Sequence, residues 1–237
     1  MRTYADLHLC PPLEDLTNAR SMASLLAELQ VKTVGLVVPP ERLSPLPTIA
    51  ELFKGSGFDV AKRLNLKPKS REDLLRSLRR FRGKYEIIAV ECGMLSVSRV
   101  AVRDGRVDIV YFPKQERGNS FRGNLASTCR AALEINLSEL TSGPGFGARL
   151  RSLKREIQIA AKASTKVIGS SKASSPYELR SPRDFAAMLH LMGLPLDSAL
   201  RAVSETPLDI VRKNRLRLQE SELQEGVRIV RRPTRSG

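Results

Sequence analysis

The sequence predicts an α/β fold in which parallel strands close into a TIM-barrel-like (β/α) barrel. Short runs rich in Val, Ile and Leu alternate with amphipathic helical stretches about every 25 to 30 residues, which is typical of βα units. Seven such runs occur in 237 residues, and a closed barrel typically takes about 250. An eighth strand would follow Gly193, where only helix signals occur, so we expect an irregular or incomplete barrel.

The predicted strands are short apolar runs, as expected for strands that helices cover on a parallel sheet. They occupy residues 4–9, 33–38, the stretch from 59 onward, and residues 86–92, 107–112, 133–137 and 166–171.

The predicted helices carry recognisable start signals. Ser70 is placed as an N-cap with Asp73 at the third helical position, and the helix that follows has leucines on one face and arginines on the other. Further helices are predicted over about 147–164, from 181 to 193, and from 206, the last two opening on Ser-Pro or Thr-Pro followed by Asp.

The domain organisation follows from the absence of a strong linker. The Gly-, Pro- and Ser-rich stretches 141–147 and 169–176 are short enough to be βα loops. We therefore expect a single barrel domain over residues 1–218 and a basic, mobile tail over residues 219–237.

The charge balance points to a polyanionic partner. Forty Lys and Arg against 25 Asp and Glu leave a net charge of +15, and the excess concentrates in residues 62–84, 149–166 and 201–217. Any one of these stretches is equally typical of a solvated helix face, but three together favour contacts with phosphates.

The aromatic and apolar content narrows the class of partner. The chain has no Trp, seven Phe and four Tyr, mostly inside strand or helix patterns, so it lacks a stacking platform for single strands. The partner that remains is a folded RNA recognised by its shape and backbone, or DNA bound without reading its sequence. No run approaches the roughly 18 apolar residues of a membrane span, so we expect a cytoplasmic protein without a membrane partner.

One pattern on the first strand suggests chemistry. Asp6 and His8 are two residues apart on the first strand, which predicts that they share a face and could bind a cation together with Glu91 and Glu134. The alternative, which we favour for Asp6, His8 and Glu91, is a polar network inside the barrel, because the only other histidine, His190, lies mid-helix.

Other catalytic patterns are missing. The loop 143–147 has no Lys-Ser or Lys-Thr after its glycines, and Ser170 and Ser171 have no nearby histidine in the sequence. The three cysteines form no CxxC pair and are expected to be reduced, buried thiols.

An ordered set of segments resembles the ribonuclease P protein component 3 family, which is related to the 30-kDa subunit of the eukaryotic enzyme. The segments are YADLH at 4–8, VEC at 90–92, VSRVA at 97–101, RVDI at 106–109, FP at 112–113, EINLS at 134–138, SSKA at 170–173, LRSPRDF at 179–185, AVS at 202–204, TP at 206–207 and NR at 214–215.

This resemblance implies a TIM-barrel-like subunit of a ribonucleoprotein that removes the 5′ leader of precursor tRNA. In that family the RNA supplies the catalytic centre and its magnesium ions, while the protein, without a cofactor of its own, supports RNA folding and substrate binding. The chain looks similar to the archaeal form, which pairs with a second small protein of the particle.

The family is also similar to metal-dependent barrel hydrolases of the polymerase-and-histidinol-phosphatase type, whose first strand carries His-x-His. Here Asp6 takes the first of those positions and the later histidines are absent, which implies that an ancestral metal site was lost.

Basic residues within the resembling segments are our RNA-binding candidates, together with three arginines chosen on charge alone. The first set is Arg99, Arg106, Lys172, Arg180, Arg183, Arg212 and Arg215, and the second is Arg76, Arg79 and Arg80. For Arg99 and Arg183, a salt bridge at the barrel rim is the alternative. Two rival functions remain: a stand-alone metal-dependent hydrolase or nuclease using Asp6, His8, Glu91 and Glu134, and a general nucleic-acid-coating protein.

Overall fold

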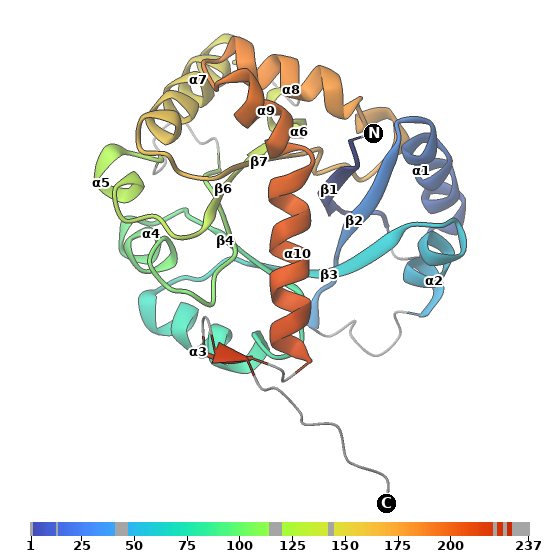
Figure 1. The fold of residues 1–237 in the computed structure, drawn as a ribbon, viewed down its shortest axis with the longest axis horizontal. Coiled ribbons are helices and arrows are strands. Elements are labelled where there is room, and N and C mark those ends of the chain that lie inside the picture. Colours follow the sequence, from blue (N-terminus) through green and yellow to red (C-terminus); the bar gives the residue numbers. More distant parts are fainter. Residues whose placement is uncertain are drawn as a thin grey trace, which may run out of the picture.

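Seven parallel strands, with helices around them, form a nearly closed barrel in the computed structural model (Figure 1). The structure describes residues 2–12, 14–40, 47–113, 120–141, 145–219, 222–224 and 227–228. The strands pair in chain order: β1 (Tyr4–Leu9), β2 (Val31–Val37), β3 (Asp59–Leu66), β4 (Ile87–Glu91), β5 (Ile109–Tyr111), β6 (Ala132–Asn136) and β7 (Val167–Ser170). The predicted α/β barrel is confirmed.

Helices surround the barrel, most of them on the outside of the strands, as the apolar runs predict (Figure 1). They are α1 (Leu16–Glu28), α2 (Pro47–Gly55), α3 (Arg71–Phe81), α4 (Leu95–Ala101), α5 (Gly123–Ala126), α6 (Ser138–Thr141), α7 (Phe146–Lys162), α8 (Pro182–Leu191), α9 (Leu196–Ala202) and α10 (Glu205–Leu218), with a 3₁₀ turn, η2 (Pro176–Glu178).

Local signals set the helix ends. The Ser70 hydroxyl accepts a hydrogen bond from the Asp73 N–H at 3.1 Å, so the predicted N-cap of α3 is confirmed. Gly193, two residues after the end of α8, has a φ of 109°, a left-handed conformation that favours glycine.

The barrel closes only in part between β1 and β7. At its carboxyl end, Leu9 and Ala173 form a parallel bridge and the Cys10 N–H donates to the Ala173 carbonyl at 2.8 Å. Nearer the amino end of β1, the Ala5 N–H donates instead to the carbonyl of Val203, just after α9, at 3.0 Å. The expected irregularity therefore lies at this seam, where a helix terminus satisfies a strand donor.

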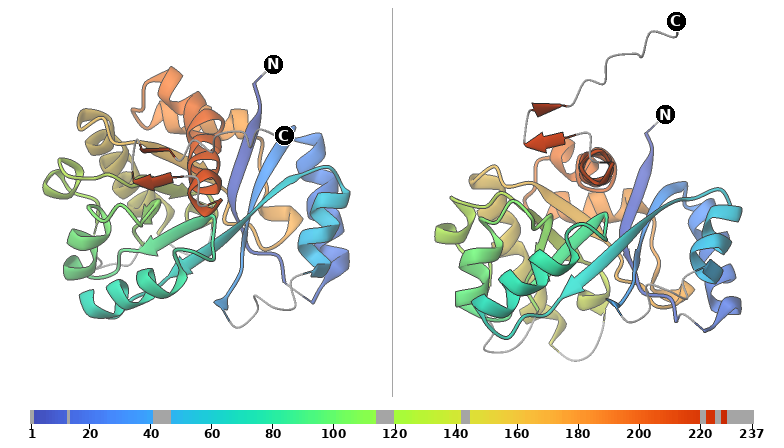
Figure 2. Two further views of the ribbon diagram at one scale, coloured as in Figure 1. Left: turned by 60° about the horizontal axis from the view of Figure 1, so that its bottom comes forward. Right: turned by 90° about the horizontal axis from the view of Figure 1, so that it is seen from below.

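Helix α10 crosses the amino end of the barrel, on the side away from the loops that follow the strands (Figures 1 and 2). Val211 is 2% exposed and joins the apolar barrel interior, with Leu208 and Ile210 beside it. Arg215 binds Asp59 and Glu86, which lie at the amino ends of β3 and β4. Among the described residues, no strand of the barrel sheet follows β7, and α10 closes the mouth in its place.

The predicted tail, residues 219–237, falls largely outside the described residues. Its described part holds a short antiparallel pair, β8 (Glu222–Gln224) with β9 (Val227–Arg228).

Candidate functional site

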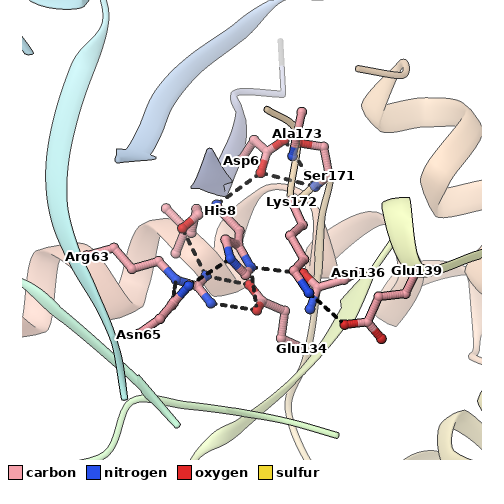
Figure 3. A network of polar contacts seen from close by, with 11 residues as sticks. Asp6, His8, Arg63, Asn65, Glu134, Asn136, Glu139, Ser171, Lys172 and Ala173 are labelled. Carbon is pink, nitrogen blue, oxygen red and sulfur yellow. Dashed lines mark hydrogen bonds and ion pairs between the residues drawn. The ribbon is translucent and has the colours of Figure 1, made fainter. Parts of the chain in front are cut away.

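Four side chains form a closed ring of hydrogen bonds inside the barrel (Figure 3). Arg63 Nη2 donates to Glu134 Oε2 at 2.7 Å, and Arg63 Nε donates to Asn65 Oδ1 at 2.7 Å. Asn65 Nδ2 lies 2.9 Å from His8 Nε2, and His8 Nδ1 lies 3.0 Å from Glu134 Oε2. The ring joins β1, β3 and β6, so it links three separate parts of the sequence.

The ring assigns the proton on His8. Nδ1 faces two acceptors, the Glu134 carboxylate and Asn136 Oδ1, each at 3.0 Å, so Nδ1 carries hydrogen. Nε2 then accepts from the Asn65 amide. Burial, and then the positive charge of Arg63, lower the pKa of His8, which agrees with a neutral imidazole.

Arg63 and Glu134 form a fully buried ion pair, with both side chains 0% exposed. Burial alone would raise the pKa of Glu134, but Arg63 beside it holds this pKa well below its usual range. Arg63 Nη1 also donates to the Leu7 carbonyl at 2.9 Å. Each charge therefore has its partner inside the barrel.

Asp6 does not join the ring. β1 has a register irregularity between Asp6 and Leu9, so the two-residue spacing does not place the Asp6 carboxylate beside the His8 ring. The carboxylate accepts instead from the backbone N–H of His8 at 3.1 Å and of Ser171 at 3.2 Å, across the seam (Figure 3). Burial raises the pKa of Asp6 to about 6.

The four residues of the metal hypothesis do not converge. Both His8 nitrogens are in hydrogen bonds, Glu134 is paired with Arg63, and Asp6 faces backbone N–H groups. Glu91 lies at the rim of the barrel, where its carboxylate pairs with Lys67 Nζ at 3.0 Å. In the part of the chain that the structure describes, no group of three or more His, Cys, Asp or Glu could hold a metal ion. These residues therefore do not fit a divalent cation.

The polar-network hypothesis, made for Asp6, His8 and Glu91, is confirmed for Asp6 and His8 and is wrong for Glu91. Glu134, which the sequence placed only in the metal hypothesis, belongs to the ring. The sequence reasoning missed Arg63, which was counted with the basic stretch 62–84, although it is 0% exposed. The available signal was the spacing of Arg63 and Asn65 within a strand, which puts both on one face.

Four RNA-binding candidates lie on two neighbouring helices. Arg76, Arg79 and Arg80 are exposed on α3, and Arg99 is exposed on α4. The two helices pack against each other (Figure 1). The side of the barrel that carries α3 and α4 thus holds a group of exposed guanidinium groups, which we call the α3/α4 face.

Two more candidates lie near the start of α8. Arg183 is exposed and its Nε donates to the Tyr4 hydroxyl at 3.1 Å. Arg180 is exposed and its Nη1 donates to the carbonyls of Tyr177 and Leu179. No carboxylate of the described residues pairs with Arg99 or Arg183, so the rim salt bridge is not formed there.

The other four candidates bind acids of the chain itself. The pairs are Arg106 with Asp104 at 2.7 Å, Lys172 with Glu139 at 3.0 Å, Arg212 with Asp209 at 2.8 Å, and Arg215 with Asp59 at 2.8 Å and with Glu86. Lys172 also lies over the Tyr111 ring. The structure thus separates cations with internal partners from the exposed arginines of the α3/α4 face.

Among the described residues none of the three cysteines forms a disulfide, as expected, with Cys92 buried and the other two partly buried. The helices of the described residues include none that is both long and apolar enough to cross a membrane.

The sequence matches one protein family along most of its length. The family model described as RNase P subunit p30 matches residues 3–219. Ribonuclease P protein component 3 of Methanococcoides burtonii is 27% identical over 220 residues, covering 90% of this chain and 89% of the relative. Its counterpart in Methanosarcina acetivorans is 31% identical over 182 residues, covering 74% of this chain and 73% of the relative.

Solved structures agree. A chain in the cryo-EM structure of archaeal ribonuclease P with mature tRNA matches with a TM-score of 0.78 and 25% identity, covering 97% of this chain and 99% of that one. The zinc-containing histidinol phosphate phosphatase of Lactococcus lactis has a TM-score of 0.51 and 10% identity, which shows a shared fold only. The chain therefore belongs to the RNase P subunit p30 family.

Proposed function

We propose that this chain acts as a protein subunit of the ribonuclease P ribonucleoprotein, which removes the 5′ leader of precursor tRNA by endonucleolytic cleavage. The observation that carries the proposal is the structural match along 97% of the chain to a chain of archaeal ribonuclease P with mature tRNA. The partners are then ribonuclease P RNA, precursor tRNA and other proteins of the particle, and the reaction takes place in the cytoplasm.

The proposal assigns catalysis to the RNA and not to this chain. Active sites of barrel enzymes lie at the carboxyl ends of the strands, and here the ring of His8, Arg63, Asn65 and Glu134 occupies the interior. A general base or a metal ligand needs a lone pair that is available to the substrate or cation. In the ring, the His8 nitrogens and the Glu134 carboxylate are already in hydrogen bonds. We propose that magnesium acts at the RNA.

The α3/α4 face is the RNA-binding surface that we propose. Arg76, Arg79, Arg80 and Arg99 are exposed, and guanidinium groups bind phosphates with two parallel hydrogen bonds. Arg180 and Arg183 extend the candidate set near α8. The ion-paired candidates Arg106, Lys172, Arg212 and Arg215 would have to exchange a carboxylate for a phosphate, so we expect smaller contributions from them.

A small protein partner is part of the proposal. Met94 and Leu95, next to the start of α4, are 50% and 42% exposed, and Phe146 at the start of α7 is 56% exposed. Methionine and aromatic side chains are enriched in protein contact surfaces, so we propose these three residues for the partner contact. We also propose that residues 1–218 form one domain, which limited proteolysis would test through a protected fragment ending near residue 218.

The deciding experiment is purification of the tagged full-length chain from its host. We expect ribonuclease P RNA and precursor-tRNA cleavage to copurify with it, and the chain stripped of RNA to have no cleavage activity. A chain that retains stoichiometric metal and hydrolyses RNA alone, with activity abolished by Asp6→Ala, would establish the metal-dependent hydrolase instead. Equal affinity for unrelated RNA and DNA at matched salt would indicate a general nucleic-acid-coating protein.

A further inference from the structure

A pocket of about 470 Å³ lies at the amino end of the barrel, beside α10 and apart from the ring and from the α3/α4 face. Its walls come from the turn before β5, from the starts of β6 and β7, and from one stripe of α10. The stripe consists of Ile210, Lys213, Asn214 and Arg217, whose spacings of three and four residues put them on one side of a helix.

The charge of this pocket is strongly positive. Its lining includes four cations, Arg130, Lys166, Lys213 and Arg217, and a single acid, Asp108. Asp108 is already neutralised, because its Oδ2 accepts from Arg82 Nη1 and from the Ile88 N–H. In the described part of the chain, no carboxylate forms an ion pair with Arg130, Lys166 or Arg217.

A second observation points to a ligand. Asn214 lines the pocket and is 1% exposed, and among the described atoms neither its Nδ2 nor its Oδ1 has a hydrogen-bond partner. An unpaired buried amide destabilises a protein, so such groups in native structures usually have a hydrogen-bond partner. An amide N–H beside several cations suits an anionic oxygen acceptor.

On the opposite face of α10 the cations form ion pairs with acids of the chain. A pocket of about 340 Å³ on that face is lined by Asp59, Asp209, Arg212 and Arg215, so its charges balance. Arg212 pairs there with Asp209, and Arg215 with Asp59. One face of α10 is thus held by internal ion pairs, while the other presents an excess of positive charge around a buried amide.

We propose that the pocket of Asn214, Arg130, Lys166, Lys213 and Arg217 binds a phosphate group, and that the backbone of ribonuclease P RNA supplies it. An anion there relieves the repulsion among Arg130, Lys166 and Arg217 and gives the Asn214 amide an acceptor. The choice of RNA as the source rests on the proposed function, whereas the affinity for phosphate rests on the pocket alone.

The test uses the full-length chain with two variants that the structure tolerates. A Cβ at Gly105, which lines the pocket, would meet no atom within 4 Å, so Gly105→Glu adds a negative charge without a clash. Asn214→Leu keeps the size of the side chain and removes only a buried amide that has no partner among the described atoms, so it should fold at least as stably. Gly55→Glu, at the end of α2 and likewise without an atom within 4 Å, is the matched charge control.

Binding of transcribed ribonuclease P RNA is measured over a range of KCl concentrations. We expect Gly105→Glu and Asn214→Leu to weaken binding about three- to tenfold. Lys166→Gln should flatten the dependence of log K on log salt by about 0.7 to 0.9. Gly55→Glu should leave both quantities unchanged. If the pocket variants bind RNA as tightly as the wild type, the pocket does not contact RNA. The proposed function is tested separately, by whether the wild-type chain binds ribonuclease P RNA.

A titration with inorganic phosphate alone distinguishes a phosphate of the RNA backbone from a free phosphate compound as the ligand. A phosphate titration should shift the side-chain amide NMR signal that disappears in Asn214→Leu, and the shift should be abolished in Gly105→Glu. A shift with phosphate but unchanged RNA binding in the variants would assign a free phosphate compound and overturn the RNA source. No shift and no effect on RNA binding would overturn the pocket as a phosphate site.

Discussion

Arg63 on β3 and Glu134 on β6 face each other across the barrel interior and form a two-pronged ion pair, with Nη2 and Oε2 2.7 Å apart. Because β3 and β6 are not neighbours in the sheet, the pair spans the barrel interior. His8 and Asn65 complete its hydrogen bonds, so these four side chains fill this part of the barrel interior.

Removing one partner of this pair should destabilise the fold strongly. Glu134→Gln leaves the Arg63 charge buried without compensation, and we expect the free energy of unfolding in urea to fall by about 3–5 kcal/mol. The control is Arg212→Gln, whose ion pair is 77% and 61% exposed and should contribute under about 1 kcal/mol. Similar decreases of the unfolding free energy in both variants would contradict the view that burial makes the Arg63–Glu134 pair costly to break.

Asp6 should make the protein less stable as the pH rises from 4 to 6. Burial raises its folded pKa from 3.8 to about 6, so in this range the folded state holds more protons than the unfolded state. The stability that Asp6 contributes is therefore fully present below pH 3.8 and is lost through pH 6.

The measurement is the difference between the unfolding free energies of wild type and Asp6→Asn, taken at several pH values. The difference isolates Asp6 from His8, whose lowered pKa has the opposite effect below pH 6.5. We expect the wild type to lose about 2–3 kcal/mol relative to Asp6→Asn over the window. A constant difference would show that Asp6 does not titrate there.

Substitution of the α3/α4 face should weaken RNA binding and its salt dependence. For Arg76→Gln, Arg79→Gln and Arg80→Gln we expect log K against log salt to flatten by about 0.7 to 0.9 for each phosphate that is no longer neutralised. Arg20→Gln is the matched control, since Arg20 is exposed on α1, across the barrel from α3 and α4 (Figure 1). Unchanged slopes in all three variants would place the RNA elsewhere.

Arg215 should matter for stability more than for RNA binding. It joins α10 to β3 and β4 through Asp59, Glu86 and the Val60 carbonyl, while its side chain stays 33% exposed. We expect Arg215→Ala to lower the unfolding free energy by about 1–2 kcal/mol after allowance for solvent screening. Arg212→Ala, one turn earlier on the same helix, should change the unfolding free energy by under about 0.5 kcal/mol. Equal effects of the two variants would show that the ion pairs of Arg215 do not stabilise the packing of α10 on the barrel.

The cysteines should be unreactive in the folded protein. Burial raises the pKa of Cys10 and Cys129 to about 11 and of Cys92 to about 12, so few thiolates exist near pH 8. Alkylation by iodoacetamide should be slow for all three until urea is added. Rapid labelling of one cysteine under native conditions would show that its surroundings open.

The strands were predictable because they are read from local patterns. Each apolar run from β1 to β7 lies within two residues of its expected bounds, apart from β3, for which no end was predicted. The Ser70 cap needs only residues three apart. The same local reasoning misplaced the Asp6 carboxylate, because a register irregularity in β1 depends on pairing with β2 and breaks the two-residue alternation.

By itself the sequence determined the βα repeat, the positive charge and the resemblance to the family, since these depend on residues read in order. Only the tertiary structure decided which charges are neutralised inside the molecule. Arg63 meets Glu134 from 71 residues away, and Arg215 meets Glu86 from 129 residues away, so no spacing reveals either pair. The pocket beside α10 arises in the same way, because its cations converge only after the helix crosses the barrel mouth.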